Sequence, residues 1–346
     1  MKRAEGHVDG LDMQSKKKRF EKGLRDVTCV NVEKMVGSGM YGTVFKARDP
    51  ATNELLALKK MKRNVEDKKE YGFPITTLRE VKILKALRHT NVVDLKEIMI
   101  AKEGLNEDNE EEGVVRYCKN DVFMVFEYVA FDLAGLINTP NYSFSHDQIL
   151  WYSKQLLQGV FEMHKLKILN RDIKAANVLI TRNNVLKIAD WGLARSYSEK
   201  TAKLSGPKVI TLWYRPPELL LETRHYGAEV DMWSVGCLIA EIAMGEALLK
   251  GTEELNQLEK IYQLCGTPEG KVKDKFATYP AWEKMQFKET YPNRMKQKLS
   301  RVYPLLLNLI EDLMQLDPSD RKSASDCLDH DVFWSSTKPM LERPEL

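Results

Sequence analysis

The feature that most constrains the fold is a change of residue pattern near residue 129. From Val30 the chain carries short β-rich runs separated by turn residues, such as VNVEKMVG, GTVFKARD and ELLALKKM, which predict an antiparallel sheet. After the strand-like run DVFMVFEYV the chain becomes mostly helical, and its first long helix opens with a capping-box pair, Ser145 and Gln148. The pattern predicts an α+β fold in which a small β-rich N-lobe with one main helix precedes a larger, mostly helical C-lobe.

The same patterns place the boundaries of the chain's parts. We expect a flexible basic arm over residues 1–25, the N-lobe over 30–128, the C-lobe over 129–334 and an irregular tail over 335–346. Within the N-lobe, residues 102–121 contain the acidic run NEDNEEEG, which predicts a mobile surface loop. The basic run KKKR in the arm is consistent with either a nuclear import signal or a solvated segment.

Composition excludes several classes of protein. The 346 residues are 43% hydrophobic and 30% charged, which is typical of a globular protein. The five cysteines and six histidines are scattered without C-x-x-C or H-x-x-x-H pairs, so we expect a reducing compartment and neither a disulfide framework nor a zinc site. No apolar run reaches the roughly 18 residues of a membrane span, and the N-terminus lacks the apolar core of a secretory signal. We expect neither a membrane nor direct nucleic acid as a partner.

A glycine-rich segment, GSGMYGTV, matches the pattern G-x-G-x-x-G from Gly37 to Gly42. Dinucleotide-binding folds share this pattern, but there the last glycines must open a helix. Here Thr43, Val44 and Phe45 continue as a strand instead. The segment is therefore either a flap whose backbone closes over phosphates or a plain glycine-rich hairpin.

Two charged residues follow within apolar surroundings. Lys59 lies in the apolar strand LLALKK, where a lysine can simply extend its amine to solvent. Glu80 lies on one helical stripe with Ile83, Leu84 and Leu87, so its carboxylate should face the core. A buried carboxylate needs a partner, and Lys59 is the economical candidate. Such an ion pair could orient the phosphates of a nucleotide.

The stretch ILNRDIKAANVLI places four polar side chains between two apolar runs: Arg171, Asp172, Lys174 and Asn177. One interpretation is an ordinary polar loop, and the other is a site that needs these groups close together. The strand VLKIA then leads into DWG, whose first residue is Asp190. Asp172, Asn177 and Asp190 form an all-oxygen set that suits magnesium, and Asp172 would be left to accept a hydroxyl proton.

These motifs occur in the order and spacing of the protein-kinase signature set. The glycine loop, strand lysine, helix glutamate, NRDIKAANV, DWG and RPPE are all present, so the chain resembles a eukaryotic Ser/Thr protein kinase from about Val30 to Phe333. The resemblance implies the bilobal kinase fold, with ATP and Mg²⁺ as cofactors.

The resemblance also implies the composition of the ATP site. Four side chains would pack on the faces of the adenine: Val36, Val44, Ala57 and Leu179. The glycines of the phosphate flap would be Gly37, Gly39 and Gly42. Phe126 would be the gatekeeper. Glu127 and Val129 would offer hinge backbone hydrogen bonds, and Asp132 would approach the ribose.

Charged groups at the phosphates follow from the same resemblance. Lys59, held by Glu80, would grip the α- and β-phosphates, while Asn177 and Asp190 would carry magnesium. Asp172 would orient and deprotonate the substrate hydroxyl, and Lys174 would neutralise charge on the moving phosphoryl group.

Two positions depart from the kinase pattern. The usual histidine before Arg171 is Asn170, and the usual phenylalanine of the metal motif is Trp191, whose larger ring costs about 1–3 kcal/mol unless its surroundings adapt. Neither change removes a charge needed for transfer. We expect them to shift the balance between active and inactive states, although they also leave open a pseudokinase scaffold.

Further segments indicate a branch of the kinases. PITTLRE resembles the cyclin-binding helix of cyclin-dependent kinases, and VITLWYRPPELLL resembles the end of their activation segment, without the T-x-Y of mitogen-activated relatives. GFPITTLRE, DLAGLI and KAANVLITR resemble the transcription-elongation branch, which acts in the nucleus on the repeat tail of RNA polymerase II. The resemblance implies a cyclin partner. A cell-cycle cyclin-dependent kinase is the alternative.

Regulation is expected at the activation segment. Arg79, Arg171 and Arg195 match the three arginines that surround an activating phosphothreonine, but the phosphoacceptor position is Gly206. Because clustered cations repel one another, we expect an anion among them, and phosphorylated Ser205 is our hypothesis.

Two further expectations concern the substrate and the flap. The resemblance implies proline-directed specificity for Ser-Pro and Thr-Pro sites, with Val209 and Ile210 shaping an apolar pocket. Tyr41 matches the inhibitory tyrosine of cell-cycle members, or is only an aromatic of the flap.

Overall fold

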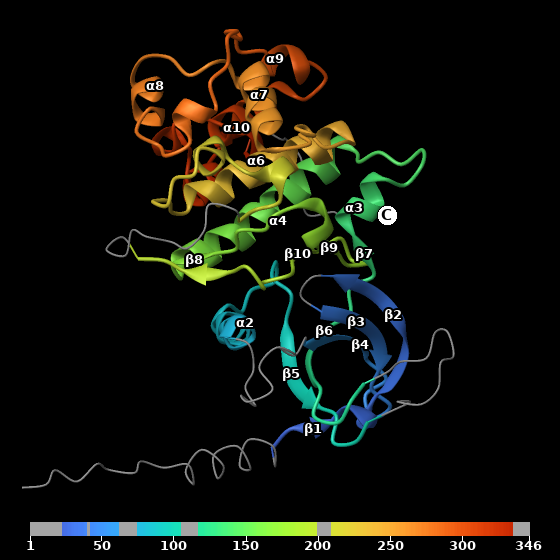
Figure 1. Cartoon of the computed structure of the whole chain (residues 1–346). Helices are drawn as coiled ribbons and strands as arrows, with labels where there is room; N and C mark the ends of the chain where they lie inside the picture. Colours follow the sequence, from blue (N-terminus) through green and yellow to red (C-terminus); the bar gives the residue numbers. More distant parts are fainter. Residues whose placement is uncertain (1–22, 40–41, 62–74, 105–116, 199–208, 335–346) are drawn as a thin grey trace, which may run out of the picture. The chain divides into compact units, whose positions relative to one another are not determined.

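The computed structural model describes residues 23–39, 42–61, 75–104, 117–198 and 209–334. They fall into two compact units (Figure 1). The sheet unit contains the described residues before residue 75 together with Asp94–Tyr128, and the helical unit contains Ile75–Val93 and the described residues from Val129 onward. A β-rich part followed by a mostly helical part confirms the α+β prediction.

The sheet unit is built on one six-stranded sheet with the order β1-β5-β6-β4-β3-β2. Its strands are β1 (Arg25–Asp26), β2 (Asn31–Gly39), β3 (Gly42–Arg48), β4 (Leu55–Met61), β5 (Leu95–Ile100) and β6 (Val122–Glu127). The predicted antiparallel pairing holds for every neighbouring pair except β1 and β5, which run parallel with Arg25 opposite Met99. Strand β1 begins at Arg25, the last residue of the segment predicted as a flexible arm, and residues 1–22 of that segment are outside the described residues.

Alternation along the strands places one face of this sheet in a hydrophobic core. The core cluster consists of Val27, Val30, Phe45, Ala47, Leu56, Leu58, Met99, Ala101, Tyr117, Phe123 and Val125. Tyr117 stacks edge-on against Phe123 at 5.8 Å between ring centroids, and the buried Asp121 pairs with Lys60 at 2.6 Å. Tyr117 and Asp121 are therefore buried, whereas residues 118–120 between them are exposed, so the last part of the surface loop predicted over 102–121 is anchored to the core at both ends. Most of the acidic run of that loop lies outside the described residues.

Helix α2 (Ile75–Ala86) belongs to the helical unit, whereas the sequence-based boundaries place it with the sheet. The segment that follows α2 explains the difference. Asn91 Nδ2 donates to Gln155 Oε1 and to the carbonyl of Leu186, both at 2.9 Å, and the backbone N–H of Val93 donates to the carbonyl of Ile188 at 3.0 Å. These bonds fasten the chain after α2 to the helical unit.

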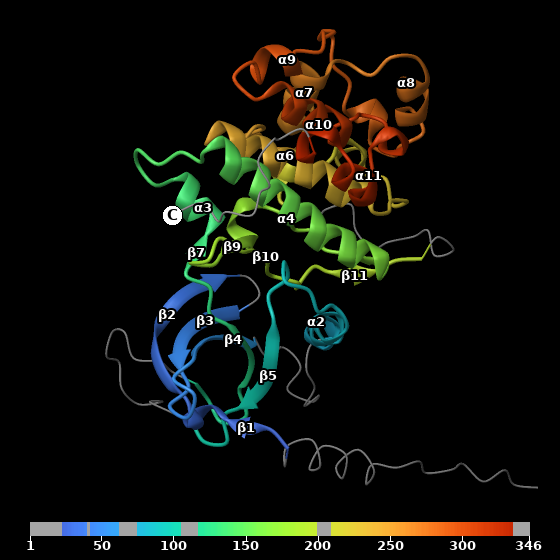
Figure 2. The same cartoon turned by 180° about the vertical axis from the view of Figure 1, so that it is seen from behind.

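The helical unit has α4 (His146–Lys165), α6 (Glu229–Met244) and α10 (Pro304–Leu313) at its centre, with α11 (Ala324–Leu328) against α4 (Figure 2). The predicted capping box opens α4: Ser145 N–H donates to Gln148 Oε1 at 2.8 Å, and Gln148 N–H donates to Ser145 Oγ at 3.2 Å. The remaining helices are α3 (Leu133–Ile137), α5 (Pro217–Leu220), α7 (Glu254–Cys265), α8 (Gly270–Phe276) and α9 (Met295–Lys298).

Short strands cross the helical unit: β7 (Phe131–Asp132), β8 (Ile168–Leu169), β9 (Val178–Ile180), β10 (Leu186–Ile188) and β11 (Arg195–Ser196). Strand β9 pairs with β7 and β10, and β8 pairs with β11. These strands hold the loops that carry the polar motifs. Within the described ranges, no helix is both long enough and apolar enough to cross a bilayer.

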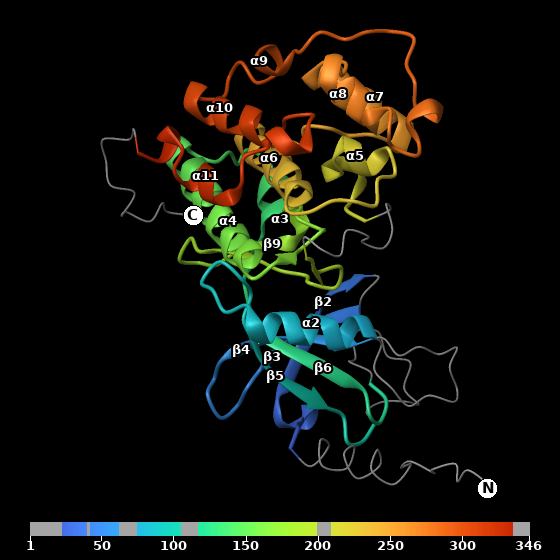
Figure 3. The ribbon, with the colours of Figure 1, turned by 90° about the vertical axis from the view of Figure 1, so that its left-hand side faces the viewer.

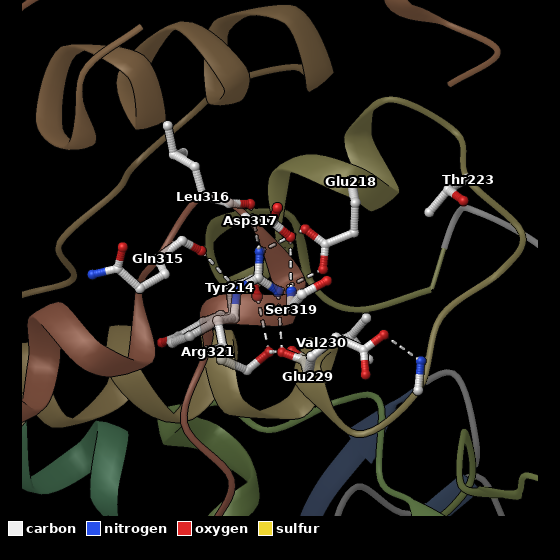
Figure 4. Close-up of polar contacts among 12 residues, drawn as sticks. Tyr214, Glu218, Thr223, Glu229, Val230, Gln315, Leu316, Asp317, Ser319 and Arg321 are labelled. Atoms are coloured by element: carbon white, nitrogen blue, oxygen red, sulfur yellow. Dashed lines mark hydrogen bonds and ion pairs between the residues drawn. The ribbon is translucent and has the colours of Figure 1, made fainter. Parts of the chain in front are cut away.

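A buried ion pair ties the segment between α10 and α11 to α5. Arg321 NH2 lies 2.7 Å from Glu218 Oε2, and both side chains are almost fully buried (Figure 4). Arg321 also donates to the backbone carbonyls of Gln315, Leu316 and Glu229, at 2.8, 3.3 and 3.1 Å. The guanidinium therefore has an acceptor on each of its three nitrogens, which offsets the cost of its burial.

Candidate active site

A carboxylate on α6 holds the loop between β8 and β9. The backbone N–H groups of Asn170 and Arg171 donate to the two carboxylate oxygens of Asp231, at 3.0 and 2.9 Å. Asp231 is completely buried and also lies 3.1 Å from His164 Nε2. Arg171 has φ +63°, a left-handed conformation that a non-glycine residue adopts only when its surroundings hold it. These contacts turn the next residue, Asp172, in a fixed direction.

Three side chains donate hydrogen bonds to the carboxylate of Asp172. Lys174 Nζ and Asn177 Nδ2 each lie 2.8 Å from Oδ2, and Thr211 Oγ1 donates to Oδ1 at 2.7 Å. Lys174 Nζ also donates to Thr211 Oγ1 at 3.0 Å, which closes the ring of contacts. Asp172 is 4% exposed, so these donors rather than bulk water fix its orientation.

Asn177 and Asp190 lie close together through the backbone that carries them. The N–H of Ala189 donates to the carbonyl of Asn177 at 2.8 Å, and Ile188 pairs with Val178 across β9 and β10. The Asn177 amide nitrogen donates to Asp172, so its amide oxygen remains to ligate a cation. This oxygen and the Asp190 carboxylate are hard donors, so the chemistry of the pair fits Mg²⁺.

The two departures from the kinase pattern are both buried. Trp191 is 1% exposed, and its indole N–H donates to the carbonyl of Ile188 at 3.3 Å. Asn170 is fully buried, and its Oδ1 accepts the backbone N–H of Asp172 at 3.0 Å, while its Nδ2 has no hydrogen-bond partner in the described part of the chain. The larger ring is thus accommodated, and Asn170 supports the backbone of Asp172 at the cost of one unsatisfied donor.

Arg171 is satisfied by groups of the helical unit itself. Its Nε and NH2 donate to the carbonyl of Leu193 at 3.0 and 2.7 Å, and its NH1 donates to the Tyr226 hydroxyl at 3.0 Å. These neutral acceptors satisfy the donors of Arg171 but do not remove its positive charge, so an anion such as phosphorylated Ser205 stays a prediction. Arg79 and Arg195 lie in α2 and β11 of the same unit. The predicted regulatory residues Ser205 and Tyr41 are outside the described residues.

In the sheet unit, four predicted ATP residues share one face. Val44 lies opposite Lys59, and Ala57 lies opposite Phe126. Because Ala57 and Lys59 are two residues apart on β4, both pairs point to the same side of the sheet. A Cβ on Gly42 would collide with the carbonyl oxygen of Lys60, so only glycine fits at this position of the flap.

The flap residues Gly37 and Gly39 lie on β2 opposite Val44 and Gly42, and Val36 precedes them with 44% exposure. The sheet unit also carries Glu127, whose Oε1 accepts the N–H of Asp94 at 3.0 Å.

The other predicted nucleotide residues belong to the helical unit: Val129, Asp132 and Leu179. Asp132 caps α3 through a 2.7 Å bond from Gly135 N–H to its Oδ1. Glu80 is 3% exposed, which confirms that its carboxylate faces a core, and Lys59 is 8% exposed. These two residues belong to different units, so their ion pair stays a prediction.

The segment before the RPPE motif has an unusual backbone. Ile210 is buried and has φ +71°, a conformation that is strained for a β-branched residue. Arg215 stabilises it: Nε and NH2 donate to the Ile210 carbonyl at 3.1 and 3.0 Å, and NH1 lies 2.8 Å from Glu254. The carbonyl of Ile210 is therefore occupied by the chain itself.

Sequence reasoning missed two residues that shape this site. Thr211 reaches Asp172 from 39 positions away, and its only signal is that it follows the Val209–Ile210 segment already expected to meet the substrate. Asp231 reaches the catalytic loop from 60 positions away. The sequence does carry one signal for Asp231. It is a carboxylate near the start of the apolar run that forms α6, where a charged group requires partners.

Comparisons with known proteins agree with this geometry. Residues 30–333 match the family model described as a protein kinase domain. Cyclin-dependent kinase C-2 of Oryza sativa subsp. japonica is 42% identical over 92% of this chain, and cyclin-dependent kinase 9 of Homo sapiens is 42% identical over 88%. The alignments cover 61% and 80% of those relatives, so this chain spans about three fifths of the length of the plant proteins.

Among solved structures, a chain of the yeast RNA Pol II CTD kinase CTDK-1 complex superposes with a TM-score of 0.79 at 36% sequence identity. The match covers 93% of this chain and 97% of that one.

Proposed function

Because this chain belongs to the protein kinase family, and within it to the cyclin-dependent kinases, we propose that it transfers the γ-phosphoryl group of ATP to serine or threonine hydroxyls of a protein. The observation that carries the proposal is the arrangement around Asp172. A buried carboxylate with a lysine on one oxygen and a threonine hydroxyl on the other is suited to receiving a substrate hydroxyl in the same place.

In this proposal each group has one task. Asp172 orients the substrate hydroxyl and accepts its proton. A general base in this role accelerates the reaction about 10²–10⁴-fold. Lys174 already touches Asp172 and supplies positive charge beside the transferring group. Asn177 and Asp190 would hold Mg²⁺, which would neutralise charge on the phosphates. Lys59, with Glu80, would hold the other phosphates of ATP.

The proposed substrate is the repeat tail of RNA polymerase II, and the proposed activator is a cyclin. Support comes from the likeness to the yeast RNA Pol II CTD kinase CTDK-1 complex and to several cyclin-dependent kinases. A kinase with this substrate acts in the nucleus. A cell-cycle role remains the second candidate on the sequence motifs, and the identity of the cyclin that co-purifies with the chain distinguishes the two.

A preference for proline after the phosphoacceptor has a physical basis in the strained backbone of Ile210. Its carbonyl is turned toward Arg215, so it cannot accept an N–H from a substrate backbone that runs alongside. A buried N–H without an acceptor costs about 1–3 kcal/mol. Proline has no N–H to leave unsatisfied, so it avoids this cost. Ile210 is 3% exposed, so the apolar surface for the proline ring would come from Val209, which is partly exposed, rather than from the Ile210 side chain.

The test uses the full chain purified with its cyclin, radiolabelled ATP and two repeat-tail peptides that differ only in Ser-Pro against Ser-Ala. We expect Mg²⁺-dependent transfer that is lost with a chelator, restored by added Mg²⁺ and at least tenfold faster on the Ser-Pro peptide. No transfer to any peptide, with ATP binding retained, would favour the pseudokinase alternative. Equal rates on both peptides would refute the proline preference alone.

A further inference from the structure

Two large apolar side chains are exposed on elements that follow Thr211 along the chain. Trp213, in the short helix Leu212–Tyr214, is 40% exposed, and Leu255, in the first turn of α7, is 41% exposed. Single exposed apolar side chains are common on protein surfaces and need no explanation. Here two of them come from elements that contact each other, and both adjoin residues of the proposed substrate site.

Two partly buried hydrogen bonds hold Trp213 against the turn that leads into α7. Its indole N–H donates to the carbonyl of Gly251 at 2.9 Å, and its own carbonyl accepts Gln257 Nε2 at 3.3 Å. Gln257 is fully buried and accepts the N–H of Gly251 at 2.9 Å. A Cβ on Gly251 would come within 2.8 Å of the Gln257 backbone, so the turn requires glycine. Leu255 lies within this bonded segment, between Gly251 and Gln257.

Trp213 and Leu255 adjoin the part of the site that would recognise the residue after the phosphoacceptor. Thr211, which contacts Asp172, is only two positions before Trp213, and Glu254, which precedes Leu255, holds Arg215 on the Ile210 carbonyl. Helices α5 and α7 are in contact beside this segment (Figure 3). If Ile210 meets the residue after the phosphoacceptor, Trp213 and Leu255 lie where the following substrate residues pass.

We propose that Trp213 and Leu255 form a second substrate subsite, the Trp213–Leu255 platform, which binds an apolar side chain located C-terminal to the phosphoacceptor. The inference rests on the proposed function, because it assigns the substrate to the same site. Rigidity supports it: the bonds to Gly251 and Gln257 hold the indole before the ligand arrives, so little conformational entropy is lost on binding. A leucine or aromatic side chain of the substrate is the occupant.

The experiment uses the full chain with its cyclin and Ser-Pro peptides of one length. A single leucine is moved through roughly the second to sixth positions after the serine in an alanine background, a range that an extended peptide spans at about 3.3 Å per residue. We expect one position to lower KM about five- to tenfold against the all-alanine peptide, with kcat unchanged, as half-burial of a leucine predicts.

Variants assign the effect to the platform. The ratio of kcat/KM for the preferred leucine peptide to that for the alanine peptide should fall to about one in Leu255→Ala and persist in Leu255→Met. Leu166→Ala is the matched control, because Leu166 is 42% exposed but lies just beyond the end of α4, outside the site. The ratio should be unchanged in this control.

Three outcomes would overturn the platform: no leucine position is preferred, the preference survives Leu255→Ala, or Leu166→Ala removes it as well. If no peptide is phosphorylated, the proposed function fails, and fluorescence anisotropy of the labelled leucine and alanine peptides decides the platform by itself. Tighter binding of the leucine peptide that Leu255→Ala abolishes supports the platform. Equal binding of both peptides refutes it.

Discussion

Asp172 and Glu218 are both carboxylates buried in the helical unit, at 4% and 1% exposure, but their partners differ in kind. Glu218 meets the planar fork of Arg321, which is held by three backbone carbonyls and lies 5.0 Å from the ring of Trp233. Asp172 meets single donor atoms, the amine of Lys174 and the hydroxyl of Thr211, which also bond to each other.

The difference teaches how a fold separates stability from chemistry. A bidentate arginine–carboxylate pair makes both of its hydrogen bonds in one geometry only, and any other geometry is less favourable. Lys174 is 24% exposed in its side chain and offers rotatable donors, so its bonds can be exchanged when another hydroxyl or phosphate arrives. Glu218 therefore holds the fold in place, whereas Asp172 remains able to react.

Asp172→Asn should separate the two roles most clearly. We expect kcat to fall about 10²–10⁴-fold because the amide cannot accept the proton, while the midpoint of thermal unfolding changes little. Initial rates and a melting curve on the same preparation measure both. Asp147→Asn, an exposed carboxylate on α4, is the control and should keep full activity. Activity of Asp172→Asn within tenfold of wild type would contradict the assigned role.

Breaking the other pair should cost stability. Glu218→Leu leaves Arg321 buried with an uncompensated charge, and we expect a loss of about 3–5 kcal/mol in the free energy of unfolding, read from urea titrations. The double variant Glu218→Leu with Arg321→Met should recover much of that loss, because it buries no charge at all. If the single variant unfolds at the wild-type urea concentration, the pair does not hold the fold as described.

Thr211→Val tests whether the site depends on exchangeable donors. Valine keeps the shape but removes the hydroxyl that donates to Asp172, a bond to a charged group worth about 1.5–3 kcal/mol. We expect kcat/KM to fall about tenfold or more and the free energy of unfolding to fall by up to about 1.5–3 kcal/mol, with Thr211→Ser rescuing both. Equal activity of the valine and serine variants would show that the hydroxyl is dispensable.

The smallest expected effect is a pH dependence of the stability of the fold, which comes from Glu241. Its Oε2 accepts the Tyr214 hydroxyl at 2.6 Å, and burial raises the pKa of this carboxyl above its ordinary value of 4.5. The folded state therefore binds the proton more tightly than the unfolded chain does. Stability from this group is full below pH 4.5 and is lost as pH rises through the raised pKa.

Glu241→Gln keeps an acceptor for Tyr214 but cannot ionise. We expect its melting temperature, relative to wild type, to increase as pH rises from 4.5 toward 8, measured by calorimetry in matched buffers. A difference that stays constant across this range would show that Glu241 ionises equally in both states.

Local motifs made much of the catalytic loop predictable. Asp172, Lys174 and Asn177 lie within six positions, and the two neighbours indeed bond to Asp172. The capping box of α4 and the inward face of α2 followed from spacing alone, because both depend on residues within one or two helical turns.

Long-range contacts were not predictable in the same way. Thr211 and Asp231 reach the loop only when α6 and the segment that begins at Val209 have packed, and no local pattern encodes that packing. The accommodation of Trp191 depends likewise on a backbone carbonyl, which every residue carries. Strand β1 is two residues long, too short to show any periodicity.

That short strand has a consequence for how the protein behaves at high concentration. β1 pairs with the outer side of β5 and thereby caps a row of backbone donors and acceptors, with Arg25 anchored to Asp49 and Glu97 at 2.9 and 2.8 Å. An uncovered strand of this kind is a template on which another molecule can add its own strand. A shortened chain that begins at Val27 would keep the core residues Val27 and Val30 but carry such a template, and its tendency to aggregate would then be set by the two missing residues of β1 rather than by the core.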